Sequence, residues 1–319
     1  MTAEPATNPD AASTATRPLA VAAAKGDKYL LYHRTPAAIG SGTSLNTPHT
    51  ERHAMAAQLL VDDAWLADRR DDPSVHVVDV REPWEYDTLG HLPGAVNIPF
   101  EQYRDSDSDD PGTLPGGDTV GRLLGDAGIE PGDTVVAYDD THGVFAARFV
   151  LTALAYGHDE VALLDGDFSS WRRQHETTDD TPSVAATTYD IGGLVPDAPI
   201  VGREAVETAI ADGGTTLIDT RNQDEYDEAH LPGAIRLDWM ELVDEESRGV
   251  KTAEAIDTLL TDRGISTDRD QPVILYCNTS RRLSHTFVVL RSLGYTDVAV
   301  YEGSMTEWLA ADGATETAG

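Results

Sequence analysis

The chain alternates short apolar runs with segments in which apolar residues recur at helical spacing. Residues 216–219 and 297–301 are typical of strands, and the continuous apolar run 273–276 is typical of a strand buried on both faces. Residues 252–263 and 283–293 have the periodicity of helices. Strands that alternate with helices predict an α/β fold, with a mostly parallel sheet flanked by helices.

The same pattern occurs twice. Val-Val-Asp-Val-Arg at 77–81 returns as Leu-Ile-Asp-Thr-Arg at 217–221, and the His-Leu-Pro-Gly-Ala that begins at His91 returns 139 residues later. The separation drifts from 140 residues early in the two copies to 137 late in them, where Trp171 corresponds to Trp308. A repeat of this length is a whole domain, because solenoid repeats are far shorter.

The repeat predicts two domains with irregular segments around them. In chain order we expect an extension, a first domain, a linker, a second domain and a tail over 1–55, 56–175, 176–198, 199–312 and 313–319. The extension is rich in Ala, Thr, Pro and Asp, and we expect it to be disordered. Met55 is a candidate natural start, which N-terminal mass spectrometry of the native protein would test.

The charge of the chain is strongly negative. It has 56 acidic and 23 basic residues, a formal net charge of −33, and only three lysines. Such a composition predicts adaptation to high salt, which screens the self-repulsion, and it argues against nucleic-acid or anionic-membrane partners. No apolar run reaches the roughly 18 residues of a transmembrane helix. Because residues 1–55 also lack the apolar core of a secretory signal, we expect a cytoplasmic protein.

Cys277 is the one cysteine of the chain and the first candidate for chemistry. It follows the run 273–276 and precedes a predicted helix, with Arg281 and Arg282 four and five residues later. Helix amides and cationic side chains favour a thiolate, whereas many free cysteines are only small buried apolar groups. A single cysteine excludes an internal disulfide, a CxxC pair and a thiolate-rich zinc site, and we expect neither metal nor cofactor.

Two motifs connect the chain to a known family. Residues 226–237 read Tyr-Asp-Glu-Ala-His-Leu-Pro-Gly-Ala-Ile-Arg-Leu, and residues 298–308 read Val-Ala-Val-Tyr-Glu-Gly-Ser-Met-Thr-Glu-Trp, with Met305 where an aromatic residue is usual. With the cysteine loop and the duplication, they make residues 57–312 resemble rhodanese-type sulfurtransferases of the tandem two-domain kind. The resemblance implies two rhodanese-like α/β domains, of which only the C-terminal one is catalytic. Asp139 replaces the cysteine in the first copy, which agrees with that division.

The resemblance also implies the chemistry. Cys277 would take the outer sulfur of a small anionic donor such as thiosulfate, hold it as a persulfide, and pass it to cyanide or a thiol by double displacement. Backbone N–H groups of the loop would face the sulfur, and one arginine would bind the oxyanion while the other pairs with a carboxylate. Glu225 and Thr279 depart from the vertebrate-type pattern, so 3-mercaptopyruvate and protein persulfides stay open as donors. The residues expected to bind substrate are Asn278, Thr279, Ser280, Arg281 and Arg282.

Three alternatives stay open. In the first, the protein is a persulfide carrier for a sulfur-accepting protein partner, rather than an enzyme for small acceptors. In the second, it is a phosphatase or arsenate reductase, although these have arginine at the sixth position after the cysteine, where this chain has Leu283. In the third, the first copy has a function of its own and binds a cation through Asp139, Asp140 and His142.

The duplication separates residues that hold the fold from residues that do chemistry. Asp219 and Arg221 would either orient the loop and substrate or form an ion pair that anchors a strand end. The ion pair fits better, because Asp79 and Arg81 persist in the copy without a cysteine. By the same comparison, or by their distance from the loop, we expect structural roles for His230, His285, Trp171 and Trp308.

Overall fold

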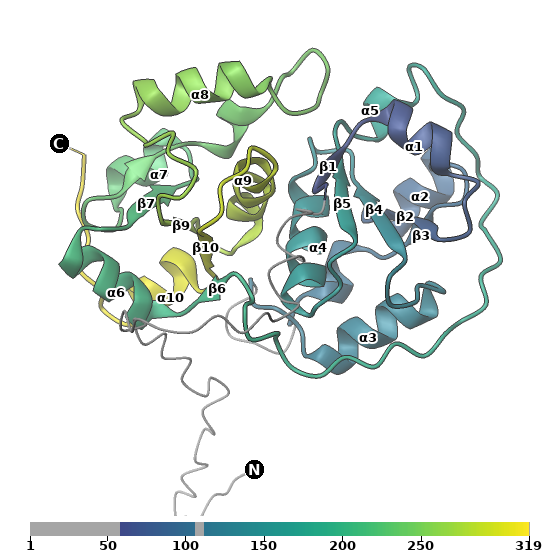
Figure 1. Cartoon of the computed structure of the whole chain (residues 1–319), viewed down its shortest axis with the longest axis horizontal. Helices are drawn as coiled ribbons and strands as arrows, with labels where there is room; N and C mark the ends of the chain where they lie inside the picture. Colours follow the sequence, from purple (N-terminus) through teal and green to yellow (C-terminus); the bar gives the residue numbers. More distant parts are fainter. Residues whose placement is uncertain (1–57, 106–111, 319) are drawn as a thin grey trace, which may run out of the picture. The chain divides into compact units, whose positions relative to one another are not determined.

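Each half of the chain folds into alternating strands and helices (Figure 1). The computed structural model describes residues 58–105 and 112–318, so the extension predicted over 1–55 lies outside the described residues. The first half contains β1 (Leu60–Val61), α1 (Asp63–Arg69), β2 (Val75–Asp79), α2 (Pro83–Leu89), β3 (Val96–Asn97), the 3-10 helix η2 (Phe100–Tyr103), α3 (Gly117–Asp126), β4 (Thr134–Tyr138), α4 (Val144–Ala155), β5 (Val161–Leu164) and α5 (Phe168–Trp171).

The second half repeats this order of elements. It contains β6 (Ile200–Val201), α6 (Arg203–Asp212), β7 (Thr216–Asp219), α7 (Gln223–Glu228), β8 (Ile235–Arg236), the 3-10 helix η3 (Trp239–Leu242), α8 (Ala253–Asp262), β9 (Val273–Tyr276), α9 (Arg281–Ser292), β10 (Val298–Tyr301) and α10 (Ser304–Ala310).

The two halves have sheets of the same topology. The strand orders are β1-β5-β4-β2-β3 and β6-β10-β9-β7-β8, and all neighbouring strands are parallel. The predicted α/β class is therefore confirmed. In both sheets the middle strand, β4 or β9, leads into the longest helix of its half, α4 or α9.

The predicted elements around Cys277 are present, with one difference at a helix start. β7 and β9 have the predicted bounds, and the Thr252 side chain caps the start of α8. The helix predicted from residue 283 begins at Arg281, because Ser280 has a left-handed φ of 61° and ends the loop earlier. The two arginines therefore belong to the first turn of α9, where backbone N–H groups have no helical partner.

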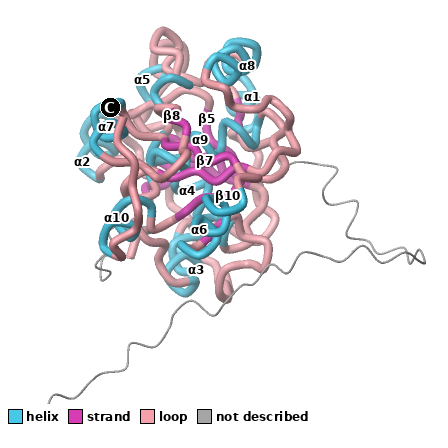
Figure 2. The backbone as a smooth tube through the Cα atoms, turned by 90° about the vertical axis from the view of Figure 1, so that its left-hand side faces the viewer, coloured by secondary structure: helices cyan, strands magenta, loops and turns pink. Residues whose placement is uncertain are grey.

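The apolar residues of each middle strand alternate between two clusters. In β9, Val273 and Leu275 belong to one cluster, and Ile274 and Tyr276 belong to another on the opposite face of the sheet. The first of these clusters also includes residues of the first half, so the halves share one apolar core. Each sheet is thus covered on both faces, and Figure 2 shows the strands enclosed by helices and loops.

Helices α4 and α9 pack against each other inside the shared core. His285 of α9 is fully buried there, edge-on to the Trp239 ring at 5.3 Å, and neither ring nitrogen has a hydrogen-bond partner. Burial, and secondarily the nearby His142, lower the pKa of His285 to about 4. The ring is therefore neutral at physiological pH and serves as a packing group.

The segment predicted as a linker, 176–198, contains neither a helix nor a strand. Its backbone lies against three glycines on one face of α3, Gly117, Gly121 and Gly125. A Cβ on Gly121 would lie 2.4 Å from the carbonyl oxygen of Tyr189, so only glycine permits this close approach. The linker is thus packed onto the first half along this helix.

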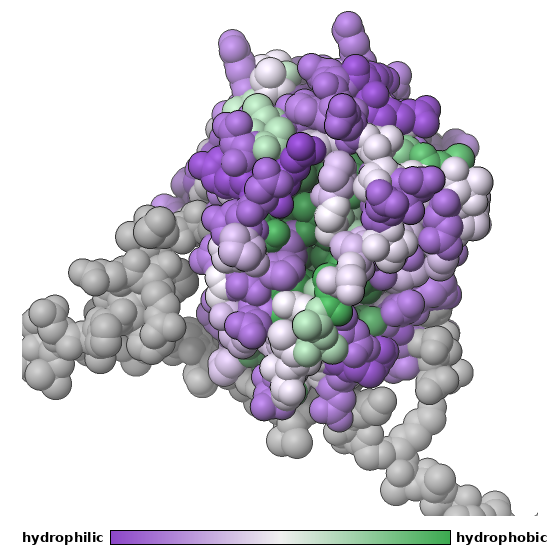
Figure 3. Space-filling view, turned by 90° about the vertical axis from the view of Figure 1, so that its right-hand side faces the viewer, coloured by the Kyte–Doolittle hydropathy of each residue, from purple (hydrophilic) through white to green (hydrophobic). Residues whose placement is uncertain are grey.

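On the face shown in Figure 3, hydrophilic side chains surround a narrower strip of apolar and weakly polar residues, in a chain of net charge −33. No helix in the described ranges is long and apolar enough to cross a membrane.

The buried histidine predicts a pH dependence of stability. The folded-state pKa of about 4 lies below the unfolded value of 6.5, so the unfolded state binds a proton on His285 more readily than the folded state does. The free energy of unfolding is therefore undiminished above pH 6.5 and falls as the pH decreases toward 4. Between pH 7.5 and pH 5 the loss is about 2 kcal/mol. In His285→Leu the free energy of unfolding should fall less over this range, as measured by urea denaturation. A parallel fall in both proteins would show that the folded state protonates this ring.

Candidate active site

Cys277 is the first residue after β9 and is 1% exposed. Its backbone N–H donates to Ser304 Oγ at 3.1 Å, and its carbonyl accepts from the Met305 N–H at 3.1 Å. Both partners belong to α10, whose start therefore holds the strand end in place. The position of the thiol is set by backbone contacts, which do not depend on the cysteine side chain.

The loop from Cys277 to Ser280 is tied to the turn between β10 and α10. Ser280 Oγ donates to the Glu302 carbonyl, and Thr306 Oγ1 donates to the Asn278 carbonyl at 2.8 Å. Ser284 Oγ donates to the Ser280 carbonyl at 2.6 Å. These bonds hold Ser280 in its left-handed conformation, which is uncommon for a residue other than glycine.

In the first half, the corresponding loop surrounds a carboxylate of its own. Asp139, at the position of Cys277, is fully buried, and its carboxylate accepts four backbone N–H groups. They come from Thr141 at 2.7 Å, Gly143 at 2.8 Å, Phe145 at 2.8 Å and Ala146 at 3.1 Å. Burial raises the pKa of Asp139, and these hydrogen bonds oppose that shift. The loop is a cradle for a negative charge at the end of the middle strand.

The corresponding N–H groups in the second half are those of Thr279, Arg281, Leu283 and Ser284, since the two loops align with an offset of 138. His142 and Ser280, which correspond, both have left-handed φ values, 55° and 61°. The second loop has the same turn, but a thiol replaces the carboxylate. The same amide arrangement is therefore available to a charge carried by the Cys277 sulfur or by a group bound to it.

Asp139, Asp140 and His142 do not converge on a cation. The oxygens of Asp139 face N–H donors, and the Asp140 carboxylate accepts from Ser169 N at 2.9 Å and Ser169 Oγ at 3.0 Å. The structure therefore gives no support to a cation site here, and the described residues contain no cluster of His, Cys, Asp or Glu able to hold a metal ion.

The two arginines of the loop differ in their partners. Arg282 forms a bidentate pair with Glu225, with bonds of 2.6 and 2.8 Å. Arg281 has its guanidinium over the Phe145 ring of the first half at 4.6 Å, and its Nε is buried without a hydrogen-bond partner. Burial lowers the pKa of Arg281, while the nearby Cys277 opposes this shift. One arginine is thus neutralised by a carboxylate, and Arg281 has no carboxylate partner among the described residues.

Asp219 and Arg221 form a buried pair, with contacts of 2.6 to 3.1 Å. Asp79 and Arg81 form the same pair in the first half, with contacts of 2.5 to 3.1 Å. This geometry anchors the end of a strand in both halves. In the second half alone, Arg221 Nη1 also donates to Asn278 Oδ1 at 3.3 Å, which connects the anchor to the loop.

The histidines and tryptophans singled out in the sequence lie in structural positions. His230 stacks on Tyr226 and His91 on Tyr86, both at 3.8 Å. Trp171 and Trp308 are buried, and each indole N–H donates to a backbone carbonyl.

The first half contributes directly to the surroundings of the cysteine loop. Arg148 of α4 is buried and donates to Glu302 Oε1 at 3.0 Å and to the Gly112 carbonyl at 2.6 Å. The Leu114 N–H also donates to Glu302 Oε1, at 2.6 Å. Because the Glu302 carbonyl holds Ser280, these contacts link the first half to the loop. Glu302 lies in the motif over 298–308, but no local pattern in the sequence indicated its pairing with Arg148 or the place of Phe145 beside Arg281.

The second half makes equivalent contacts with the first half. Arg248 of the second half donates through Nε to both carboxylate oxygens of Asp167 at 2.8 Å, and the Val250 N–H donates to Asp165 Oδ1 at 2.7 Å. Asp165 corresponds to Glu302 in the repeat. Each half therefore donates a backbone hydrogen bond to the carboxylate that follows β5 or β10 of the other half. The two halves are thus joined by equivalent polar contacts.

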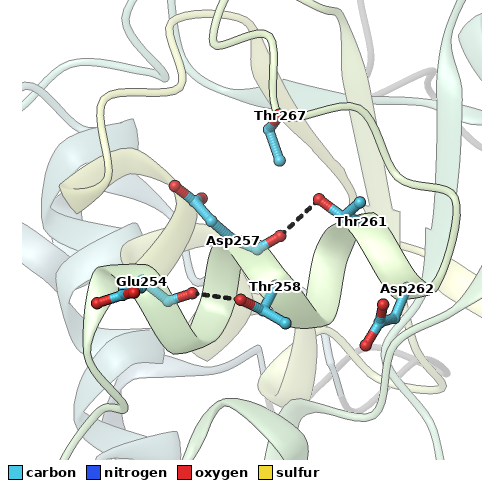
Figure 4. Close-up of a pocket in the computed structure, with 6 residues that line it drawn as sticks. All are labelled: Glu254, Asp257, Thr258, Thr261, Asp262 and Thr267. Carbon is cyan, nitrogen blue, oxygen red and sulfur yellow. Dashed lines mark hydrogen bonds between the residues drawn. The ribbon is translucent and has the colours of Figure 1, made fainter.

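A hollow of about 560 Å³ lies along α8 and does not have Cys277 in its lining, and Figure 4 shows two of its threonines bonded to their own helix. It contains no nucleophile and is a surface depression. A smaller hollow of about 80 Å³ lies in front of Asp139, between Arg81 and Phe145. The lining residues of the α8 hollow are Glu254, Asp257, Thr258, Thr261, Asp262 and Thr267.

A duplicated parallel α/β domain, with a thiol at the middle strand of one copy and a carboxylate in the other, defines a tandem protein with one thiol-bearing half. The chain belongs to the rhodanese-like domain family, whose model matches residues 62–174 and 203–311.

The chain is similar to relatives named thiosulfate sulfurtransferases. The chain is 30% identical over 263 residues to the thiosulfate sulfurtransferase of Pseudomonas aeruginosa, which covers 78% of this chain and 93% of the relative. It is 30% identical over 270 residues to that of Corynebacterium glutamicum, with 78% and 87% covered. The crystal structure of SseA from Escherichia coli, described among 3-mercaptopyruvate sulfotransferases, superposes with a TM-score of 0.68 at 27% identity, covering 77% of this chain and 98% of SseA.

The buried pair between the halves predicts a large loss of stability on mutation. Arg148→Met leaves Glu302 without its cation and should lower the free energy of unfolding by about 3–5 kcal/mol. Arg203→Met removes an exposed pair with Glu207 and should change it by less than about 1 kcal/mol. Both are measured by chemical denaturation. Equal effects of the two substitutions would contradict the role given to Arg148.

Proposed function

We propose that the protein is a sulfurtransferase that moves sulfane sulfur from a small anionic donor, thiosulfate or a related compound, to cyanide or a thiol through a persulfide on Cys277. The observation that carries the proposal is the Asp139 carboxylate in the first half, held by four backbone N–H groups. A persulfide or a donor at Cys277 would bring negative charge to the equivalent place, where the second half has no carboxylate of its own.

The reaction is a double displacement. The Cys277 thiolate attacks the outer sulfur of thiosulfate, a new sulfur–sulfur bond forms, and the bond to the central sulfur breaks as sulfite leaves with the electron pair. Cyanide carbon then attacks the outer sulfur of the persulfide. Thiocyanate leaves, and the electron pair returns to the Cys277 sulfur. No second cysteine is needed, which suits a chain with only one.

Arg281 is the residue that we assign to the donor's oxyanion. It has no carboxylate partner among the described residues, and it lies near Cys277. A guanidinium presents several donors in a plane, which suits the three oxygens of a thiosulfonate group. Because Cys277 is almost fully buried, a compact donor and a compact acceptor fit this site best.

Removal of the thiol should abolish turnover. Cys277→Ser keeps the size of the side chain and the backbone bonds to Ser304 and Met305, so the fold should persist while thiocyanate production from thiosulfate falls to background. The assay is colorimetric detection of thiocyanate, with circular dichroism to verify folding. Mass spectrometry should find an added sulfur on the thiosulfate-treated wild type only. Undiminished thiocyanate production by Cys277→Ser would sink the assignment.

The loss of Arg281 should weaken donor binding more than it slows the chemical step. Arg281→Leu removes a charge-assisted contact, so KM for thiosulfate should rise by about tenfold or more, with a smaller fall in kcat. Arg281→Lys keeps the charge and should lie between the wild type and the leucine variant. An unchanged KM in Arg281→Leu would assign the oxyanion to another group.

A further inference from the structure

Glu225 occupies a position that both halves share. It is the third residue of α7, as Glu85 is the third residue of α2, and each faces the backbone N–H of its helix cap. Glu85 accepts from the Glu82 N–H at 3.2 Å, which is an ordinary cap at a helix start. Glu225 accepts from the Asn222 N–H at 3.4 Å in the same kind of cap. Both glutamates therefore cap their helices, and the two halves differ in the further partners of the carboxylate.

The shorter bonds of Glu225 go to the cysteine loop. Its two oxygens accept from Arg282 at 2.6 and 2.8 Å, and Oε1 also accepts from Asn278 Nδ2 at 2.6 Å. The first half has Val144 and Asp140 at the positions of Arg282 and Asn278, so Glu85 has no equivalent donors. The duplication thus provides an internal comparison, in which the same glutamate serves the loop only where the cysteine is present.

This bonding determines which guanidinium groups near the cysteine loop are left without a carboxylate partner. The hydrogen bond from Arg282 lowers the pKa of Glu225, so the carboxylate is ionised and neutralises that arginine. Arg221 is likewise held by Asp219. In the described part of the chain, Arg281 is then the one guanidinium at the loop without a carboxylate partner. A donor meets one free positive charge there.

We propose that Glu225 determines donor specificity: by neutralising Arg282 it leaves a site for donors that carry their charge in one compact group beside the transferred sulfur. Thiosulfonates are such donors. In a 2-oxo acid thiol such as 3-mercaptopyruvate, a methylene and a carbonyl separate the sulfur from the carboxylate, so the charge lies farther from the transferred sulfur. We infer that Arg282, once released from Glu225, is the cation that would bind this carboxylate. The inference rests on the proposed sulfurtransferase function and names the class of donor.

The test is Glu225→Gln, which keeps the size of the side chain and releases the charge of Arg282. We would measure kcat/KM with thiosulfate and with 3-mercaptopyruvate, with cyanide as acceptor, at the lowest KCl concentration that keeps the wild type folded, because salt screens the effect. The ratio of kcat/KM for 3-mercaptopyruvate to that for thiosulfate should rise about tenfold, the effect of one charge-assisted contact. An unchanged ratio overturns the inference.

Two further variants separate charge from structure. Glu85→Gln makes the same change in the first half and should leave the ratio unaltered. Glu225→Gln combined with Arg282→Gln should return the ratio to the wild-type value, because the released cation is gone. If the double variant keeps the gain, Arg282 is not the cation, and the inference is wrong. Thermal unfolding of each variant verifies that the fold is intact.

A binding measurement distinguishes failure of this inference from failure of the proposed function. In the Cys277→Ser background, where no transfer occurs, calorimetric titration would compare sulfite with pyruvate. Glu225→Gln should strengthen pyruvate binding relative to sulfite by about tenfold. If the wild type transfers no sulfur but this shift occurs, the proposed function fails, while the control of anion binding by Glu225 through Arg282 stands. If the wild type transfers sulfur and no shift occurs, only the inference about Glu225 fails.

Discussion

The structure depends on one electrostatic requirement: backbone N–H groups at the turn from each middle strand to its longest helix need a negative partner. In the first half the Asp139 carboxylate supplies it and is held by four such groups. In the second half a thiol stands at the same point, at the end of an equivalent strand in an equivalent sheet. The fold therefore builds the same turn twice, with left-handed residues His142 and Ser280 at equivalent positions. In the first half the carboxylate at the strand end fills the turn, and the second half has a thiol there instead of a carboxylate.

The charge of the chain makes this arrangement demanding. With a net charge of −33, most cations near the loop are taken by carboxylates, as Arg282 is by Glu225 and Arg221 by Asp219. Arg281 escapes such pairing because its neighbour from the first half is the ring of Phe145, which attracts a cation without neutralising it. The half without a cysteine thus contributes contacts to the surroundings of the cysteine loop. It holds Glu302 through Arg148, and it shapes the setting of the free guanidinium.

Elements with local signals could be predicted from the sequence. The run 273–276 is a strand, and the helix over 252–263 is present, because periodicity is a property of neighbouring residues. The start of α9 was predicted two residues late, because the left-handed turn at Ser280 is produced by contacts with Glu302 and not by a residue type that favours it. Which arginine is paired could not be read at all, because Glu225 lies 57 residues before Arg282. The Arg148–Glu302 pair spans 154 residues and has no local signature.

The sequence by itself determined the α/β class, the duplication and the place of Cys277 between a strand and a helix, because these follow from the order and spacing of residues along the chain. It also separated residues kept in both copies, such as Asp219 and Arg221, from the cysteine kept in one. Only the tertiary structure decided that the loop around Asp139 is an amide cradle, that Arg281 has no carboxylate partner among the described residues and that Glu225 neutralises Arg282. These facts depend on distances between groups remote in sequence, which are set when the helices pack against the sheets and the two halves share one core.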